Sequence, residues 1–350
     1  MKYTYTDLGG AAKWSSTSPS ILRISIYLEN RLINFMKTFP IIDLHQDLLL
    51  HRKKRELFDH EWQTDFSLLE EHKVKVTVAT AFPYPEDEDF FAPKTNGLIE
   101  AQFEEYNRYC EEQENWQIIK DEQDLEQVLS SENLFGLILH IEGLNVFPKQ
   151  GFEALARWYE MGWRSLGLVW NYANELGGGT KDNEVDLSEL GQEVLDWLEQ
   201  KNMVIDLAHM NKNTFNSAID YINKSALVSH TYSAQLYSNQ RNITDKQLQK
   251  VETTDGVIGV FFSDKFINPT SSSIDDVVKH IKYIVEKIGI EHVAVGSDFG
   301  GILEGAPTNL SSVADFDNLW SRLKQEGFTK EEIEKIGYKN AKRVLSEYLQ

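Results

Sequence analysis

The chain has 350 residues, of which 41% are hydrophobic and 26% are charged, a composition typical of a globular protein. It carries 55 Asp and Glu residues against 35 Lys and Arg residues, which gives a formal net charge of −20. Nucleic acids and anionic membranes select basic surfaces, so this balance argues against both as main partners. The length permits one large barrel domain or two to three smaller domains.

The single cysteine, Cys110, excludes an internal disulfide framework and any metal site built from cysteine alone. A metal would therefore need His and carboxylate ligands. The sequence shows no transmembrane span and no signal peptide, because the most apolar early stretch, residues 21–28, is interrupted by Arg23. A reducing, cytoplasmic location without a membrane partner is the simplest expectation.

The first 35 residues differ from the rest, with a Ser/Thr/Pro cluster at 15–20 and no chemical motif. Met36 then opens a segment that reads like a natural start. Two interpretations stay open: residues 1–35 are an extension upstream of the true start site, or they form a helix packed under the fold. Residues 36–350 are expected to form one catalytic domain that closes with C-terminal helices.

From Met36 onward, short apolar runs alternate with longer amphipathic stretches. The runs are rich in Val and Ile and nearly continuous, as expected for strands buried on both faces. We predict strands at 41–47, 74–82, 134–143, 163–170, 203–210, 226–231, 256–262 and 292–300. Apolar residues recur every three or four positions in the predicted helices at 95–113, 151–161, 188–201, 213–222 and 273–288. Eight strands separated by helices predict a (β/α)8 TIM barrel. An open doubly wound sheet is the alternative, weakened by the lack of a Gly-rich loop after the first strand.

In a (β/α)8 barrel, the active site lies at the C-terminal ends of the strands. Five of the predicted strands end in His, Asp or Glu: these residues are His45, Asp47, Glu142, His209, His230 and Asp298. His45 and Asp47 lie two positions apart, so both side chains can face the same way. So many ionisable groups at one mouth are costly without a cation. Three imidazoles and three carboxylates suit one or two divalent ions, with Zn²⁺ favoured among the common choices.

At these positions the sequence resembles the membrane dipeptidase (renal dipeptidase) family of the metal-dependent amidohydrolase superfamily. The matching motifs follow the family's order: Asp-Leu-His-Gln-Asp-Leu at 43–48, Ile-Glu-Gly at 141–143, Ile-Asp-Leu-Ala-His at 205–209, Ser-His at 229–230, Arg-Asn-Ile-Thr-Asp at 241–245 and Gly-Ser-Asp-Phe at 296–299.

The resemblance implies two Zn²⁺ ions per chain, although other divalent metals suit the same ligands. His45 and Asp47 would bind the first ion. His209 and His230 would bind the second ion, and Glu142 would bridge both. A hydroxide shared by the two ions would attack the peptide bond of a dipeptide substrate.

The resemblance also assigns residues to the substrate. Asp298 would act as acid and base, and Arg241 would bind the terminal carboxylate. Trp170 stands where mammalian members carry a histidine on the fourth strand, so it is expected near the substrate and leaves the substrate preference open. Family members often form dimers, which makes a homodimer an expectation of the resemblance alone.

The leading hypothesis is a zinc-dependent dipeptidase. A second hypothesis keeps the metals and changes the substrate to another amide, a lactam or an N-acyl amino acid. A non-catalytic scaffold is a third, disfavoured because the ligand set is complete. Two further polar residues are expected to have structural or supporting roles. Asp206 either satisfies backbone groups or orients a ligand histidine, and His140 is expected to be a buried, hydrogen-bonded histidine.

Overall fold

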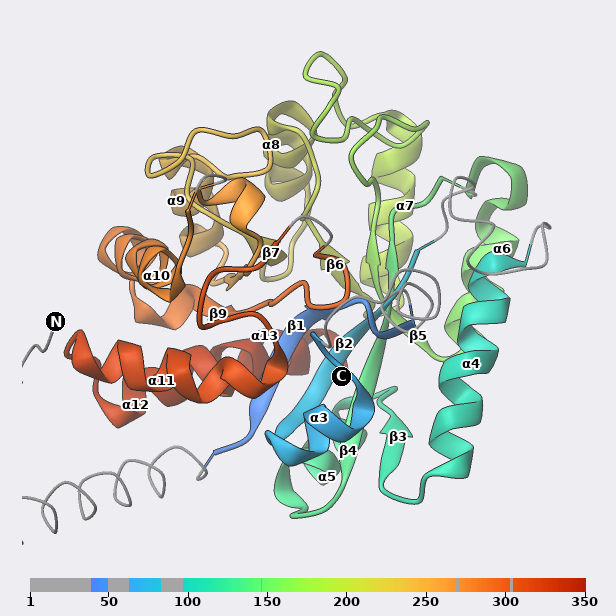
Figure 1. Ribbon diagram of the computed structural model, residues 1–350. Coiled ribbons are helices and arrows are strands. Elements are labelled where there is room, and N and C mark those ends of the chain that lie inside the picture. The colour runs from blue at the N-terminus through green and yellow to red at the C-terminus, as the bar shows by residue number, and fades with distance from the viewer. Residues whose placement is uncertain (1–38, 50–62, 83–96, 146, 269–270, 303–304) are drawn as a thin grey trace, which may run out of the picture. The chain divides into compact units, whose positions relative to one another are not determined.

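The computed structural model describes residues 39–49, 63–82, 97–145, 147–268, 271–302 and 305–350. The predicted boundary at residues 35 and 36, and both interpretations of the first 35 residues, lie outside this range. Within the described range, helices surround a central set of strands, with α4 and α6 at one side and α10 and α11 at the opposite side (Figure 1).

Eight parallel strands form the core. They are β1 (Ile41–Gln46), β2 (Val74–Ala81), β4 (Phe135–Glu142), β5 (Trp163–Gly167), β6 (Val204–Asp206), β7 (Leu227–Thr231), β8 (Val257–Val260) and β9 (Val293–Val295). Nearly every residue of these strands is buried. This explains the continuous apolar runs in the sequence, since one face of each strand packs inside the barrel and the other against helices.

The sheet closes on itself. β1 pairs with β2 on one side and with β9 on the other, and β2 pairs with β4 over Val76–Ala81. The remaining neighbours pair in chain order from β4 to β9. The prediction of a (β/α)8 TIM barrel is therefore confirmed, and the alternative of an open sheet is wrong.

A ninth strand, β3 (Trp116–Ile118), does not belong to the barrel. It pairs with Phe135–Leu137, at the beginning of β4, whereas β5 pairs with β4 from Leu139 onward. The sequence pattern did not indicate this strand, because three residues are too few to show a periodicity.

The predicted helices are confirmed to within a few residues at each end. Together with the helices that were not predicted, they are α3 (Phe66–Glu71), α4 (Leu98–Glu112), α5 (Glu122–Ser130), α6 (Phe147–Met161), α7 (Glu189–Gln200), α8 (Lys212–Tyr221), α9 (Asp245–Thr253), α10 (Ile274–Ile288), α11 (Phe316–Gln325), α12 (Lys330–Glu334) and α13 (Asn340–Tyr348). Local capping residues set several starts. Ser188 accepts a hydrogen bond from the Gly191 N–H at α7, and Asn211 accepts one from the Thr214 N–H at α8. One start differs from the prediction, because α6 begins at Phe147 and contains a non-helical residue, Gly151, with φ of 63°.

Apart from β7, which ends at Thr231 as predicted, the barrel strands are shorter at their C-terminal ends than predicted. β6 ends at Asp206 and β9 at Val295, whereas the predicted strands continued to residues 210 and 300. The chain leaves the sheet at these points, and residues of the predicted site lie in the turns that follow.

Candidate metal centre

The six strand-end residues of the predicted site meet at the C-terminal end of the barrel. His45, Glu142 and His230 lie on β1, β4 and β7. Asp47 directly follows β1. His209 and Asp298 lie in the turns after β6 and β9. Residues from five strands therefore converge, although they are widely separated in the sequence.

Glu142 lies at the centre of the cluster. Its Oε1 atom is 2.9 Å from His209 Nε2, 3.5 Å from His45 Nε2 and 3.7 Å from His230 Nε2. Two groups of potential ligand atoms share Glu142, and within each group the atoms lie within 4.8 Å of one another. One comprises Glu142, His209 and His230, and the other comprises His45, Asp47 and Glu142. The geometry thus offers two neighbouring cation positions with a common carboxylate.

His209 and Asp298 have unusual backbone conformations. Both have φ of 63°, in the left-handed region that residues other than glycine rarely adopt. Such a conformation costs about 1–3 kcal/mol and persists where surrounding contacts hold it. At Asp298 the backbone N–H donates to the His45 carbonyl at 3.0 Å, and the Asp47 N–H donates to the Phe299 carbonyl at 2.9 Å. These two hydrogen bonds join the turn after β9 to the end of β1, so together they position the carboxylates of Asp47 and Asp298.

Hydrogen bonds to the far ring nitrogens determine which nitrogen of His209 and of His230 carries a proton. The Asn171 Oδ1 atom lies 3.1 Å from His209 Nδ1, and because an amide oxygen is an acceptor, Nδ1 carries the proton. Ser229 Oγ donates to the Asp206 carboxylate at 2.5 Å. The same oxygen lies 2.7 Å from His230 Nδ1 and is left to accept a hydrogen bond from it.

Both Nε2 atoms therefore present lone pairs toward the cluster. They face each other at 3.0 Å, and Glu142 Oε1 lies 2.9 Å from His209 Nε2. Burial lowers the pKa of both histidines well below 6.5, so neither ring gains a second proton near neutral pH. Three lone-pair atoms so close together repel one another unless a proton or a metal cation lies among them. The donor set fits a divalent metal.

The carboxyl groups of Glu142 and Asp298 also favour a nearby positive charge. Burial raises the pKa of Glu142 and of Asp298, and the neighbouring Asp47 raises both further. Burial disfavours the charged form of His45, yet Glu142 and Asp47 raise its pKa overall. Crowded, buried carboxyl groups hold protons unless another positive charge replaces them, and a bound cation supplies that charge.

Arg241 and Trp170 border this cluster. Arg241 is buried, its pKa is lowered first by that burial, and Asp298 and Glu142 act on it electrostatically in the opposite direction. Its Nη2 atom has no hydrogen-bond partner among the described residues. The half-buried Trp170 lies beyond the end of β5, with its ring 6.1 Å from that of His209 and 4.9 Å from that of Phe82.

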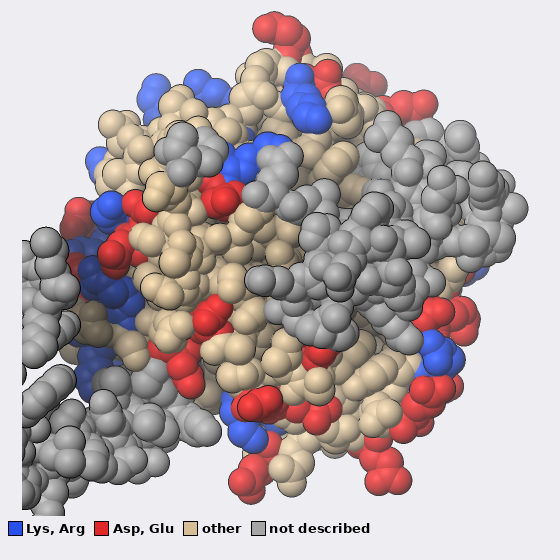
Figure 2. Space-filling view, viewed as in Figure 1, with Lys and Arg blue, Asp and Glu red and all other residues tan. Residues whose placement is uncertain are grey.

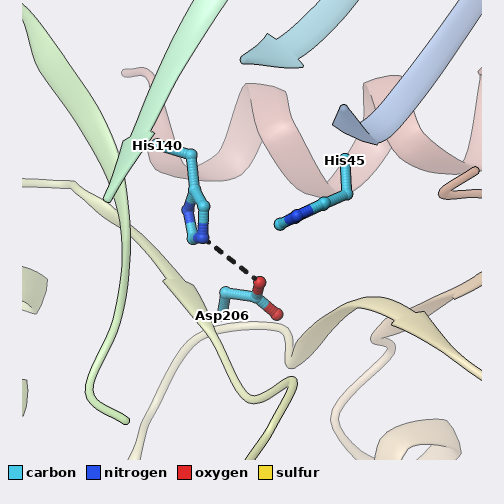
Figure 3. A group of neighbouring side chains, drawn as sticks. All are labelled: His45, His140 and Asp206. Atoms are coloured by element: carbon cyan, nitrogen blue, oxygen red, sulfur yellow. Dashed lines mark ion pairs between the residues drawn. The ribbon is translucent and has the colours of Figure 1, made fainter. Parts of the chain in front are cut away.

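Figure 3 shows Asp206 of β6 beside His140 of β4, with His45 nearby. Asp206 accepts hydrogen bonds from the backbone N–H groups of Ala208 and Ser229, each at 2.9 Å. Through the Ser229 hydroxyl it also orients His230, as described above. Asp206 therefore fills both roles that the sequence left open, and the histidine it orients is His230.

His140 matches its interpretation as a buried, hydrogen-bonded histidine. It is fully buried, and its Nδ1 atom lies 2.8 Å from Ser165 Oγ. Its other nitrogen, Nε2, is 3.7 Å from the Asp206 carboxylate, which is too far for a hydrogen bond. The ring lies 5.6 Å from that of His45, and His45, His140 and Asp206 form a further group of neighbouring ligand atoms.

The sequence reasoning missed Asn171, the acceptor for His209. Its Oδ1 atom also accepts a hydrogen bond from Thr180 Oγ1 at 3.0 Å. Gly179 allows the two segments of this loop to approach, because a Cβ atom there would collide with the Trp170 carbonyl oxygen. The available sequence signals are a polar residue soon after a barrel strand and the following run of three glycines.

Comparison with known proteins identifies the family. A sequence model described as membrane dipeptidase, peptidase family M19, matches residues 29–350. The chain belongs to the membrane dipeptidase family. An uncharacterised dipeptidase of Schizosaccharomyces pombe is 26% identical over 347 residues, which are 90% of this chain and 82% of that protein. A dipeptidase of Aspergillus terreus is 38% identical over 151 residues, 41% of this chain and 36% of that protein.

Solved structures share the fold. A metallopeptidase from Rhodobacter sphaeroides, liganded with a phosphinate mimic of L-Ala-D-Ala, superposes with a TM-score of 0.78 at 19% identity. The match covers 89% of this chain and 99% of that one. The probable dipeptidase PvdM from Pseudomonas aeruginosa gives a TM-score of 0.79 at 17% identity, covering 93% of this chain and 99% of that one.

Family membership confirms that the chain is an enzyme of the metallo-dipeptidase class. The family implies divalent-metal binding, and the cluster around Glu142 has suitable ligands for it. Among the helices in the described range, none combines the length and the apolar character needed to cross a membrane.

Proposed function

We propose that this chain hydrolyses the peptide bond of dipeptides with two divalent cations, Zn²⁺ by preference, bound at the end of the barrel. The observation that carries the proposal is the position of Glu142, whose carboxylate belongs to both groups of ligand atoms. Family membership supports the substrate class. The mixed imidazole and carboxylate ligands support zinc.

In this proposal His45 and Asp47 hold one ion and His209 and His230 hold the other, while Glu142 serves both. The bound ions would supply Lewis acidity, which polarises the peptide carbonyl and lowers the pKa of the attacking water. The chain's own part is to fix the ligands. The Asn171 and Ser229 side chains orient the second pair through the far ring nitrogens.

Asp298 transfers the proton from the attacking water to the leaving nitrogen. Its Oδ1 atom lies 3.8 Å from His45 Nε2, and its side chain is 17% exposed, so it borders the cluster and still reaches the open side. Burial raises its pKa, which suits a carboxyl group that takes a proton from water and passes it to the leaving nitrogen. The turn after β9 fixes this carboxyl group beside the reaction site.

Arg241 and Trp170 bind the substrate. The unpartnered Nη2 atom of Arg241 suits the free carboxylate at the C-terminus of a dipeptide, because a guanidinium forms paired hydrogen bonds with a carboxylate. A carboxylate bound there limits the substrate to short peptides. Trp170, next to the ring of His209, provides an aromatic wall for the same site.

Two measurements test the proposal. Metal analysis of the purified chain should give close to two divalent ions per chain. Glu142→Gln keeps the side-chain volume but removes the shared charge, so it should reduce the occupancy of both sites. Glu184→Gln, at an exposed position, is the matched control and should leave the metal content unchanged.

A panel of dipeptides assayed with Zn²⁺ should then release free amino acids, whereas N-acyl amino acids and lactams should react slowly. Activity confined to acylated substrates or lactams would replace the dipeptidase proposal with the alternative amide hydrolase. A chain with no affinity for divalent metal would exclude both. The cytoplasmic location and the homodimer stay predictions.

A further inference from the structure

A cavity of about 230 Å³ lies beside the candidate metal centre, between the beginnings of α8 and α9. His209 and Arg241 both line it, so it adjoins the cluster and the guanidinium. The first residues of α8, Asn211 and Lys212, form one wall, and Thr244 and Gln247 at the start of α9 form another. The cavity therefore shares His209 and Arg241 with the candidate site.

The cavity is positively charged in an acidic protein. Lys212 and Arg241 line it, whereas none of its described lining residues is Asp or Glu, although the chain carries a net charge of −20. Figure 2 shows acidic side chains spread over the visible face of the molecule, with basic side chains interspersed among them. Lys212 is exposed and forms no ion pair with any residue in the described part of the chain.

Two independent features point to an anionic ligand. The N-termini of α8 and α9 both border the cavity, and the N-terminal end of a helix carries partial positive charge. In addition, Arg241 is 5% exposed and keeps an unpartnered Nη2 atom. A buried donor without a partner is costly and indicates a ligand that completes it.

The size of the cavity limits what can bind. Pockets for drug-sized ligands have volumes of about 300–1,000 Å³, and this cavity, at about 230 Å³, is smaller. It suits one amino-acid residue and not a longer peptide. Because Arg241 lines the cavity, a residue whose main-chain carboxylate binds Arg241 would place its side chain in the remaining space.

We propose that this cavity is the subsite for the C-terminal residue of the dipeptide and that Lys212 favours an acidic side chain there, Glu or Asp. The inference rests on the proposed dipeptidase function and adds the substrate class. The carboxylate of the side chain would pair with the Lys212 ammonium at the start of α8, while Arg241 holds the main-chain carboxylate.

The test compares Ala-Glu with Ala-Gln, which have nearly the same shape and differ in charge, with both the L and the D form of the second residue. An exposed ion pair is worth about a fivefold change in an equilibrium at most. We expect kcat/KM for Ala-Glu to exceed that for Ala-Gln by about threefold in the unmodified enzyme. In Lys212→Glu the preference should invert, because the added carboxylate repels the substrate side chain.

Lys246→Glu is the matched control. Lys246 is exposed in the first turn of the neighbouring α9 and does not line the cavity, and its replacement changes the net charge by the same amount. This variant should keep the preference for Ala-Glu. Metal content, measured on each variant, checks that the metal centre is intact.

Equal rates for Ala-Glu and Ala-Gln in the unmodified enzyme would overturn the inference and leave the dipeptidase function standing. A preference that falls equally in both lysine variants would also overturn it, because the effect would then come from overall charge. Absence of hydrolysis with every dipeptide would instead refute the proposed function.

Discussion

Replacing Asn171 tests whether the support of a ligand histidine matters as much as the ligand itself. The Asn171 Oδ1 atom accepts the hydrogen bond from His209 Nδ1 at 3.1 Å, and His209 is 8% exposed. Asn171→Leu removes this acceptor at similar side-chain volume. The N–H of His209 would then be buried without a partner, which costs about 1–3 kcal/mol. The left-handed backbone of His209, with φ of 63°, would lose one of its restraints.

The expected result is weaker metal binding. Removing the partner of a ligand histidine typically lowers metal affinity by about 10- to 100-fold, and the desolvation cost above corresponds to a similar range. Competition with a chromogenic chelator measures the Zn²⁺ affinity directly, without relying on turnover. Asn171→Asp keeps an acceptor oxygen and should bind Zn²⁺ nearly as well as the unmodified chain.

The control variant is Asn174→Ala. Asn174 belongs to the same loop and donates to the Leu168 carbonyl at 2.8 Å, but no hydrogen bond joins it to His209 in the described part of the chain. This variant should leave Zn²⁺ affinity close to normal. If Asn171→Leu binds Zn²⁺ as tightly as the unmodified chain, or if both variants lose affinity equally, the positioning argument is wrong.

Three further predictions concern catalysis, substrate binding and pH. Asp298→Asn should keep its metal ions and lose about 10²- to 10⁴-fold in kcat, because a proton-transfer group is removed; turnover near normal would exclude Asp298 as the acid and base. Arg241→Ala should raise KM for dipeptides more than it lowers kcat, since the arginine mainly binds; a selective fall in kcat would contradict that role. His280 on α10 is buried, its Nδ1 accepts the Ser233 N–H at 3.1 Å, and burial lowers its pKa from 6.5 to about 4, against opposing influence from Asp276. Because the unfolded chain binds this proton more readily, its contribution to stability is complete above pH 6.5 and is lost as the pH falls toward 4. The loss between pH 7 and pH 5 is about 2 kcal/mol from this group. Urea unfolding should therefore show a smaller loss over that interval for His280→Gln, which keeps an acceptor but does not titrate; an unchanged loss would refute this assignment.

The barrel and the ligand types could be predicted from the sequence for a physical reason. A strand buried on both faces needs an almost continuous apolar run, so a polar residue at its end stands out. His45, Glu142 and His230 were found in this way, and each lies in or at the end of its strand. The family motifs added Arg241, which lies on no strand.

Other features depended on contacts that the local sequence does not encode. The hydrogen-bonded strands end before His209 and Asp298. Both residues adopt a left-handed backbone conformation, which sets the direction of their side chains. The role of Asp206 depended on the Ser229 hydroxyl, which belongs to the neighbouring strand. Asn171 showed no periodic or charged signal, because its function is a single hydrogen bond across a loop.

By itself, the sequence determined the fold class, the nature of the candidate ligands and the lack of any all-cysteine metal site. Burial and charge impose these features locally, residue by residue, and they can therefore be read along the chain. The tertiary structure decided which groups share Glu142 and which nitrogen of each histidine faces the cluster. It also placed beside the cluster a cavity whose described lining residues include no carboxylate. These properties arise between residues far apart in the chain, where distances of about 3 Å determine whether lone pairs repel or bind a cation.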